Sequence, residues 1–254
     1  MTRRREFLRK VAGMFLASLL PPRGSLYLPY GVQHGMGVPI QLIDPATWPM
    51  QDVPFVTWDG KDYGRANHIP MVYRSTGPSE KLDDGRPLLV FNEPEDVGQA
   101  NLSPQDAAAV VSHLKWNGPL YLGGNVWHNA GWDWFNEFLN HYSGRMDGIH
   151  LHAYIRPEYM YYAERYAPRW RTLADENKWD IIVSEWFMTD LSKMAEFADM
   201  IDSMVKPSMM FYFSWRYNVE SDAVNEDGQW TEYGDMWQSI ASKSARVWMP
   251  YIGR

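Results

Sequence analysis

The chain has no cysteine among its 254 residues. Without thiols it cannot form disulfides, thiolate zinc sites or iron–sulfur clusters, and it has no cysteine nucleophile. Basic residues are also scarce, with 24 Lys and Arg against 31 Asp and Glu and a formal charge of −7. Such a chain lacks the cationic surface that binds nucleic-acid phosphates. No apolar run approaches the ~20 residues that cross a bilayer. We therefore expect neither a nucleic-acid partner nor an integral membrane segment.

Aromatic residues, by contrast, are abundant: 13 Trp, 15 Tyr and 10 Phe make up 15% of the chain. Many will belong to the core, because the length fits one large domain or two small ones with a sizeable interior. Aromatic rings also pack against the apolar faces of flat ligands such as sugars. The composition is therefore compatible with carbohydrate binding but does not establish it.

The first 24 residues are typical of an export signal. Three arginines at 3–5 precede an apolar stretch at 11–20, which is the layout of a secretory signal. Arg4 and Arg5, followed by Phe7 and Leu8, resemble the bacterial twin-arginine signal. An uncleaved amphipathic tail or a misassigned start codon is the alternative. We predict a signal segment at 1–24, a functional domain at 25–254, and a periplasmic or extracellular location.

The second half of the chain repeats with a period. Short apolar runs begin at Leu88, Leu120, Ile149, Ile181 and Met209, and successive starts differ by 32, 29, 32 and 28 residues. Helical patterns lie between and after them, at residues 104–115, 132–141, 158–176, 191–205 and 235–247. Strands alternating with helices predict βα units and a parallel sheet.

Eight such units of ~31 residues would build a (β/α)8 TIM barrel, and this is the fold we predict. The first three strands are then expected at residues 26–32, 54–58 and 69–74. Ten of the 17 prolines fall between Pro21 and Pro87, so the first three units should have short or missing helices. The alternative is an open doubly wound sheet. It should carry a glycine-rich phosphate loop after its first strand, and residues 30–35 do not match one.

Two glutamates end two of the predicted strands. Glu93 and Glu185 are 92 residues apart, which corresponds to three units. Strand alternation places Leu89, Phe91 and Glu93 on one face, and Val183 with Glu185 on the corresponding face. In TIM barrels the chemistry lies at the carboxyl ends of the strands. Two facing carboxylates there are the equipment of a glycoside hydrolase, although Asn-Glu-Pro also forms turns for purely local reasons.

The sequence around the first glutamate resembles a known family. Residues 91–95 (FNEPE) and 98–104 (GQANLSP) resemble the Asl1-like glycosyl hydrolases, glycoside hydrolase family 128, and a looser likeness extends over residues 68–215. The resemblance implies a retaining endo-β-1,3-glucanase that needs no metal or other cofactor. It also implies that Glu93 is the general acid/base, that Glu185 is the nucleophile, and that Asn92 bonds the sugar 2-hydroxyl. The family more often has Asp at the position of Glu95 and Thr-Glu-Phe at 184–186, which puts the subsites in doubt.

Further residues are expected to support this chemistry. Tyr154, on the strand beside Glu185, would donate a hydrogen bond that keeps the nucleophile ionised. We expect several other side chains near strand ends to contact the sugar chain, with core packing as the alternative for each tryptophan: Trp58, Trp127, His152, Trp186 and Trp215.

Two histidines allow a different chemistry. His150 and His152 are two residues apart on one strand and point to the same side, as in some metal sites. His128 and Asp133 are the nearest additional ligands. The interpretation that we favour instead has His152 lining the sugar cleft and His150 packing lower in the barrel, with no metal.

The sequence therefore predicts an exported, monomeric, retaining glycosidase whose partner is a β-glucan polysaccharide or oligosaccharide. Two alternatives stay open. The same chemistry can act on xylan, mannan or mixed-linkage glucan, and a non-catalytic polysaccharide-binding barrel would keep the aromatic residues without needing the glutamates.

Overall fold

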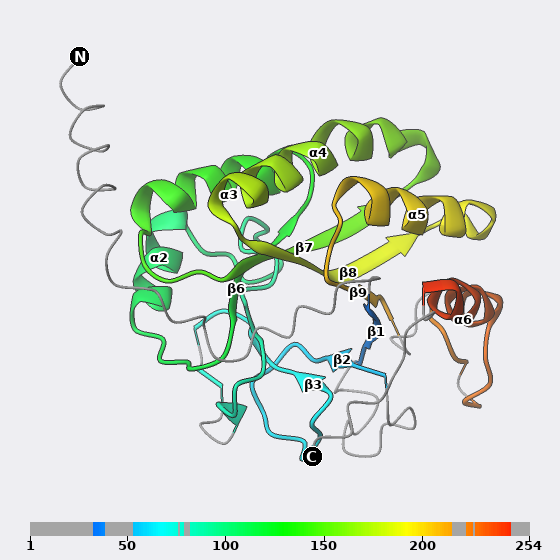
Figure 1. Ribbon diagram of the computed structural model, residues 1–254, viewed down its shortest axis with the longest axis horizontal. Coiled ribbons are helices and arrows are strands. Elements are labelled where there is room, and N and C mark those ends of the chain that lie inside the picture. Colours follow the sequence, from blue (N-terminus) through cyan, green and yellow to red (C-terminus); the bar gives the residue numbers. More distant parts are fainter. Residues whose placement is uncertain are drawn as a thin grey trace.

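The computed structural model describes residues 33–38, 53–75, 77–78, 82–214, 222–225 and 227–244. In this part of the chain, nine parallel strands form one sheet in the order β3-β2-β1-β9-β8-β7-β6-β5-β4. The sheet curls into a nearly closed barrel (Figure 1), which confirms the predicted fold class. The predicted signal segment at 1–24 lies outside the described residues.

Two short strands complete the circle. β3 pairs with β2, and β4 pairs with β5. Only Pro70 separates β3 from β4, and proline has no N–H with which to continue a ladder. Residues 68–72 thus act as one interrupted strand. Counted in this way, the barrel has the eight strands that were expected. The nine strands are β1 Gln33–Gly37, β2 Phe55–Val56, β3 His68–Ile69, β4 Met71–Val72, β5 Leu88–Val90, β6 Leu120–Val126, β7 Gly148–Ile155, β8 Asp180–Met188 and β9 Met209–Tyr212.

The apolar runs located the last five strands to within one residue. The predicted first strand at 26–32 lies outside the described residues, and the described strand between β2 and β9 is β1. β1 has the sequence QHGMG, which carries little apolar signal. Its parallel partners on both sides supply the hydrogen bonds that fix it as a strand.

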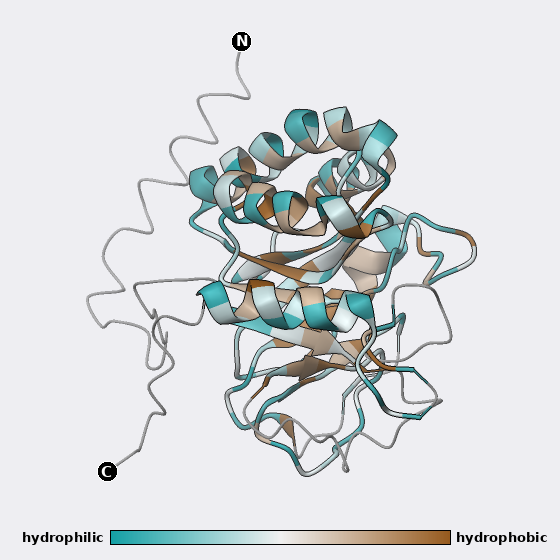
Figure 2. Cartoon of the chain, turned by 90° about the vertical axis from the view of Figure 1, so that its right-hand side faces the viewer, coloured by the Kyte–Doolittle hydropathy of each residue, from teal (hydrophilic) through white to brown (hydrophobic). Residues whose placement is uncertain are grey.

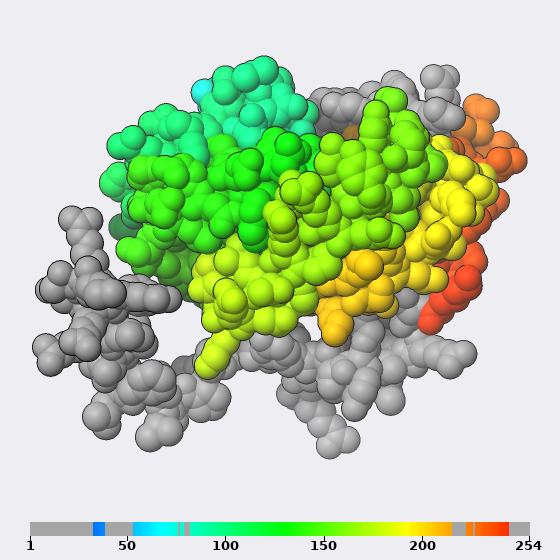
Figure 3. Space-filling view, turned by 90° about the horizontal axis from the view of Figure 1, so that it is seen from above, coloured from blue at the N-terminus to red at the C-terminus, as the bar shows by residue number. Residues whose placement is uncertain are grey.

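In the described part of the chain, five α-helices cover the half of the barrel that follows β5 (Figure 1). Figure 3 shows them in sequence order across one face, from green to red. Between β1 and β5 the described residues form no α-helix, as the prolines predicted. The helices are α2 Pro104–Ser112, α3 Asn129–His141, α4 Met160–Asn177, α5 Met194–Met204 and α6 Glu232–Ser244, with 3-10 turns η3 Pro157–Tyr159 and η4 Leu191–Lys193 before α4 and α5. None of the described helices is long and apolar enough to span a bilayer.

The core has two layers. Side chains inside the barrel form a small cluster of Val56, Ile69, Met71, Leu89, Tyr121, Ile182 and Phe211. A larger cluster lies between the strands and the helices. Figure 2 shows the same division, with apolar strands inside and hydrophilic outer faces on the helices. This rigid wall fixes the carboxyl ends of β5 to β8, where the predicted glutamates lie.

Candidate active site

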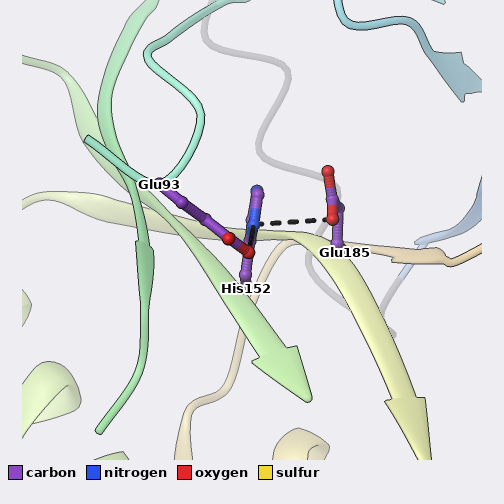
Figure 4. A group of neighbouring side chains, drawn as sticks. All are labelled: Glu93, His152 and Glu185. Atoms are coloured by element: carbon purple, nitrogen blue, oxygen red, sulfur yellow. Dashed lines mark hydrogen bonds and ion pairs between the residues drawn. The ribbon is translucent and has the colours of Figure 1, made fainter. Parts of the chain in front are cut away.

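Glu93 and Glu185 meet across the mouth of the barrel, at the carboxyl ends of β5 and β8. His152 of β7 lies between them (Figure 4): its Nδ1 is 2.8 Å from Glu93 Oε1 and 3.5 Å from Glu185 Oε2. One carboxylate oxygen of each glutamate and one nitrogen of His152 all lie within 4.8 Å of one another. Both glutamates are buried, with 9% of Glu93 and 3% of Glu185 exposed.

The backbone turns sharply to bring Glu93 inward. Phe91 and Glu93 have φ angles of 79° and 44°, in the left-handed region that few non-glycine residues occupy. The predicted alternation is therefore wrong at Phe91, whose ring packs outward against Trp134. The Glu93 N–H donates to the carbonyl of Gly124 on β6, at 2.8 Å. Gly124 itself has a φ of +63°, and a Cβ there would collide with the Phe91 carbonyl oxygen, so this approach requires glycine.

A β-bulge brings Glu185 to the same side. Leu151 pairs with Val183 and His152 with Glu185, so Ser184 is an extra residue in β8. Val183 packs in the outer cluster, and the predicted common face of Val183 and Glu185 is wrong. Because of the bulge, the nucleophile candidate points inward although the alternation counted from Val183 would not place it there.

Both oxygens of Glu185 accept hydrogen bonds. The Trp58 indole Nε1 donates to Oε1, and the Tyr154 hydroxyl donates to Oε2, the contact expected of this tyrosine. Trp58 thus belongs to the site, with its ring edge-on to Phe213. Burial raises the pKa of Glu185 to about 7, and the charge of Glu93 adds to this rise. A charged His152 and the Trp58 N–H oppose it, because both favour the carboxylate form.

His152 is fully buried, and its predicted contact with the sugar stays a prediction. Its Nδ1 faces the two carboxylates. Burial alone would lower the pKa of His152, but the charge of Glu185 and the hydrogen bond and charge of Glu93 outweigh burial and raise the pKa above its ordinary value. The two neighbouring carboxylates therefore favour the protonated form of the His152 imidazole.

His150 packs lower in the barrel, as we favoured. Its Nδ1 lies 2.9 Å from the Ser184 hydroxyl and its Nε2 lies 2.8 Å from the Val90 carbonyl. Burial lowers the pKa of His150 to about 3, so the ring is neutral. With both nitrogens bonded to the protein, His150 is not a free metal ligand. Among the described residues, metal-ligand spacing occurs in the set Glu93, His152 and Glu185.

Two predicted sugar-contacting tryptophans are core residues. Trp127 is 1% exposed, with its ring edge-on to Phe197. Trp186 is fully buried and packs edge-on against Tyr212. Trp186 follows Glu185 on β8 and therefore faces the helices, since side chains alternate along a strand. The prediction for Trp186 is wrong for this reason. The prediction for Trp127 stays a prediction, because Trp127 also lines a cavity at the carboxyl ends of β6, β7 and β8. Trp215 lies outside the described residues.

Asn92 lies beside Glu93 and is 5% exposed. Its Nδ2 donates to Gln99 Oε1 at 3.2 Å. This bond ties the amide to the loop that follows β5. The predicted hydrogen bond between Asn92 and the sugar 2-hydroxyl stays a prediction.

Sequence reasoning missed the role of Glu95. Its Oε1 accepts from the Val126 N–H and its Oε2 accepts from Asn125 Nδ2, both at 2.7 Å. The side chain therefore clamps the turn that carries Glu93 onto the end of β6. A second carboxylate two residues after Glu93 was the available signal, but we treated it only as a departure from the family pattern.

A family model described as "Glycosyl hydrolase catalytic core" matches residues 57–237. The matched region contains both glutamates, His152 and every strand of the barrel except β1 and β2. No curated protein matches the chain by sequence.

Solved structures with the same fold belong to family GH128. A curdlan-specific exo-β-1,3-glucanase (subgroup III) from Blastomyces gilchristii, in complex with glucose, has a TM-score of 0.63 and 20% identity over 82% of this chain and 98% of its own. An endo-β-1,3-glucanase (subgroup I) from Amycolatopsis mediterranei, in complex with laminaritriose, has a TM-score of 0.62 and 19% identity over 83% and 100%. One from Pseudomonas viridiflava (subgroup II) has a TM-score of 0.61 and 18% identity over 83% and 98%. At these identities the likeness establishes the common barrel.

Proposed function

The chain belongs to the glycosyl hydrolase catalytic core family, and from this premise we propose that it is a retaining β-glucan hydrolase that cleaves β-1,3 linkages. The observation that carries the proposal is the approach of a Glu93 oxygen to within 4.8 Å of a Glu185 oxygen. Retaining glycosidases hold their carboxyl groups ~5–5.5 Å apart, whereas inverting enzymes leave ~6.5–9.5 Å for a water molecule. The short separation supports retention.

In this mechanism Glu185 attacks the anomeric carbon and Glu93 protonates the departing glycosidic oxygen. Water then hydrolyses the glycosyl-enzyme, with Glu93 acting as base. Trp58 and Tyr154 hold the Glu185 carboxylate by its two oxygens. The 2.8 Å contact between His152 and Glu93 gives a path for one proton: its transfer from Nδ1 to Glu93 leaves a neutral imidazole, a protonated acid and an ionised nucleophile.

The linkage is supported by the relatives of the fold. The three structures above carry endo- or exo-β-1,3-glucanase activity, and one holds laminaritriose. The sequence block at 91–104 supports the same family. We therefore expect β-1,3-glucan to be a better substrate than xylan, mannan or mixed-linkage glucan.

The test is hydrolysis of a polysaccharide panel by the purified protein, with NMR detection of the first anomer released. We expect oligosaccharides from laminarin or curdlan, released as the β-anomer. A first-formed α-anomer would refute Glu185 as nucleophile, and preference for another polymer would refute the linkage. Binding without hydrolysis would favour the non-catalytic barrel. Activity that a chelator removes and a divalent metal restores would favour the metal alternative.

The pH dependence of this activity should depend on Trp58. Since Glu185 attacks only when ionised, and burial raises its pKa to about 7, kcat/KM should rise with pH through about 7. Trp58→Phe removes an N–H that favours the carboxylate, so the acid limb should move up by about one pH unit. Trp134→Phe is the matched control, because that indole donates to the Leu102 carbonyl instead. If the acid limb of the pH profile of kcat/KM were unchanged in Trp58→Phe, the proposed role of the Trp58 indole would be contradicted.

We also propose that residues 1–24 direct export by the twin-arginine route and that the exported enzyme is a monomer. The support is the Arg4-Arg5 pair before the apolar stretch. Arg4→Lys with Arg5→Lys should retain the protein inside the cell. Export of this variant at the normal level would contradict the proposal, and size-exclusion chromatography with light scattering tests the monomer.

A further inference from the structure

A cavity of about 460 Å³ opens beside the catalytic pair, at the carboxyl ends of β6, β7 and β8. Its volume lies within the ~300–1,000 Å³ of small-ligand pockets. Tyr154 belongs both to this cavity and to the active site, because its hydroxyl donates to Glu185. The cavity is therefore adjacent to the catalytic pair, with Tyr154 in contact with both.

The cavity has aromatic walls. Four aromatic side chains line it together with Tyr154, namely Trp127, Tyr159, Tyr162 and Phe187. Tyr159 is 46% exposed, so its ring is accessible to a ligand in the cavity. The ring centroids of Tyr159 and Tyr162 are 6.1 Å apart, with an interplanar angle of 48°. Tilted tyrosine rings with exposed faces match the C–H faces of a pyranose, while their hydroxyls reach its edges.

Polar groups supply the rest of the lining. His128, Asn129 and Thr189 offer hydrogen-bonding groups without a fixed charge, and Arg156 adds five N–H donors. Burial lowers the pKa of His128, so its ring is neutral near pH 7. No carboxylate is among the lining residues. This combination of rings and hydroxyl-binding groups suits a neutral sugar.

The order of the strands fixes where the cavity lies relative to the catalytic pair. β6, which ends next to His128 and Asn129, is the neighbour of β5, the strand that leads to Glu93. The charge of Glu93 acts on His128 across this short separation. Trp58 and Phe213 occupy the other side of the catalytic pair, over β2 and β9. The cavity, over the ends of β6, β7 and β8, thus lies on the opposite side of the catalytic pair from Trp58 and Phe213.

We propose that this cavity binds the first glucosyl units of the leaving group, with Tyr159 and Tyr162 as the stacking platform. The assignment rests on the proposed function and adds to it the residues that hold the departing chain. In a retaining enzyme the same site must also hold an acceptor sugar, because the acceptor enters where the leaving group has left.

The experiment compares two substrates whose leaving groups differ. Laminarihexaose places sugars in the cavity, whereas 4-nitrophenyl β-laminaribioside has an aryl leaving group and no sugar there. In Tyr159→Ala, Tyr162→Ala and the double variant, the ratio of kcat/KM for the hexaose to that for the aryl substrate should fall by about tenfold or more, as expected for the loss of one or two stacked rings. Transfer of glucosyl units to added laminaribiose should fall in parallel.

Two variants serve as controls. Tyr161→Phe removes an exposed hydroxyl (the residue is 52% exposed) that does not line the cavity and keeps the ring, whose centroid lies 4.2 Å from that of Tyr162, so the ratio should be unchanged. Tyr162→Phe keeps the ring and should retain most of the ratio. An unchanged ratio in the double variant, or an equal loss on both substrates, would overturn the assignment while leaving the hydrolase proposal intact. A wild-type protein inactive on both substrates would overturn the proposed function itself, and the assignment with it.

Discussion

Glu185→Gln should lower kcat on laminarin by more than ~10⁴-fold, the scale at which covalent catalysts lose activity without their nucleophile. Glutamine keeps the size of the side chain but cannot form the glycosyl ester. Loss of activity alone would not separate a nucleophile from a residue that orients the substrate. The smaller variant Glu185→Ala provides that separation, because it leaves room for an external nucleophile.

Added azide should restore turnover of an activated aryl substrate by Glu185→Ala. Azide would then attack the anomeric carbon from the face that the carboxylate has vacated, in a single displacement. The product must be the α-glycosyl azide, which NMR identifies. Glu196→Gln, on the exposed face of α5, is the matched carboxylate control and should keep full activity. More than 1% residual activity in Glu185→Gln, or a β-glycosyl azide from Glu185→Ala, would remove Glu185 from this role.

Glu93→Ala should lose activity to a degree that depends on the leaving group of the substrate. General acid–base catalysis typically contributes ~10²–10⁴-fold, and laminarin, whose leaving alkoxide needs a proton, should lose a factor in that range. A 2,4-dinitrophenyl glycoside needs little protonation, so its first step should be much less impaired. The glycosyl-enzyme should then accumulate as a burst, because the base for the second step is missing.

Azide again distinguishes the roles. In Glu93→Ala the nucleophile Glu185 remains, so azide intercepts the glycosyl-enzyme and two inversions yield the β-glycosyl azide. Glu137→Ala, an exposed glutamate of α3, is the control substitution. Equal losses on laminarin and on the dinitrophenyl substrate would indicate that Glu93 does not protonate the leaving group. An α-glycosyl azide from this variant would exchange the two assignments.

The barrel and the two glutamates could be predicted from the sequence because both follow a periodic pattern of apolar runs. Apolar runs about 30 residues apart mark β5 to β9, and Glu93 and Glu185 end two of these runs. β1 left no such trace, since a glycine-rich strand is stabilised by its neighbours rather than by its own side chains. Those neighbours are far away in the sequence, so no local pattern reveals them.

The geometry around the glutamates could not be predicted from periodicity. Simple alternation fails at Phe91, where φ is 79°, and at the bulge of Ser184. Both departures depend on hydrogen bonds and packing from adjacent strands. The position of His152 between the carboxylates follows from them, so His-Leu-His remained ambiguous between a metal site and a packed wall. Trp186 was misassigned because a tryptophan at a strand end can face either the mouth or the helices.

The role of Glu95 could not be predicted because its hydrogen-bond partners are distant in the sequence, although it supports the turn next to it. Asn125 and Val126, which it contacts, are about 30 residues away in the sequence. The contact becomes evident only when β5 and β6 are placed side by side.

The proline that divides β3 from β4 has a consequence for how the enzyme fails on heating. The strands on either side of Pro70 and the neighbouring β2 are short: β2, β3 and β4 have two residues each. We call this part of the barrel the seam. Few of its amide protons are protected by strand hydrogen bonds, so local opening should begin there. Trp58, which donates to Glu185, follows β2 by two residues. Fraying of the seam would release that donor while the helix-covered half stays folded. Thermal inactivation should therefore precede the global melting transition, and amide exchange should be fastest in residues 55–72.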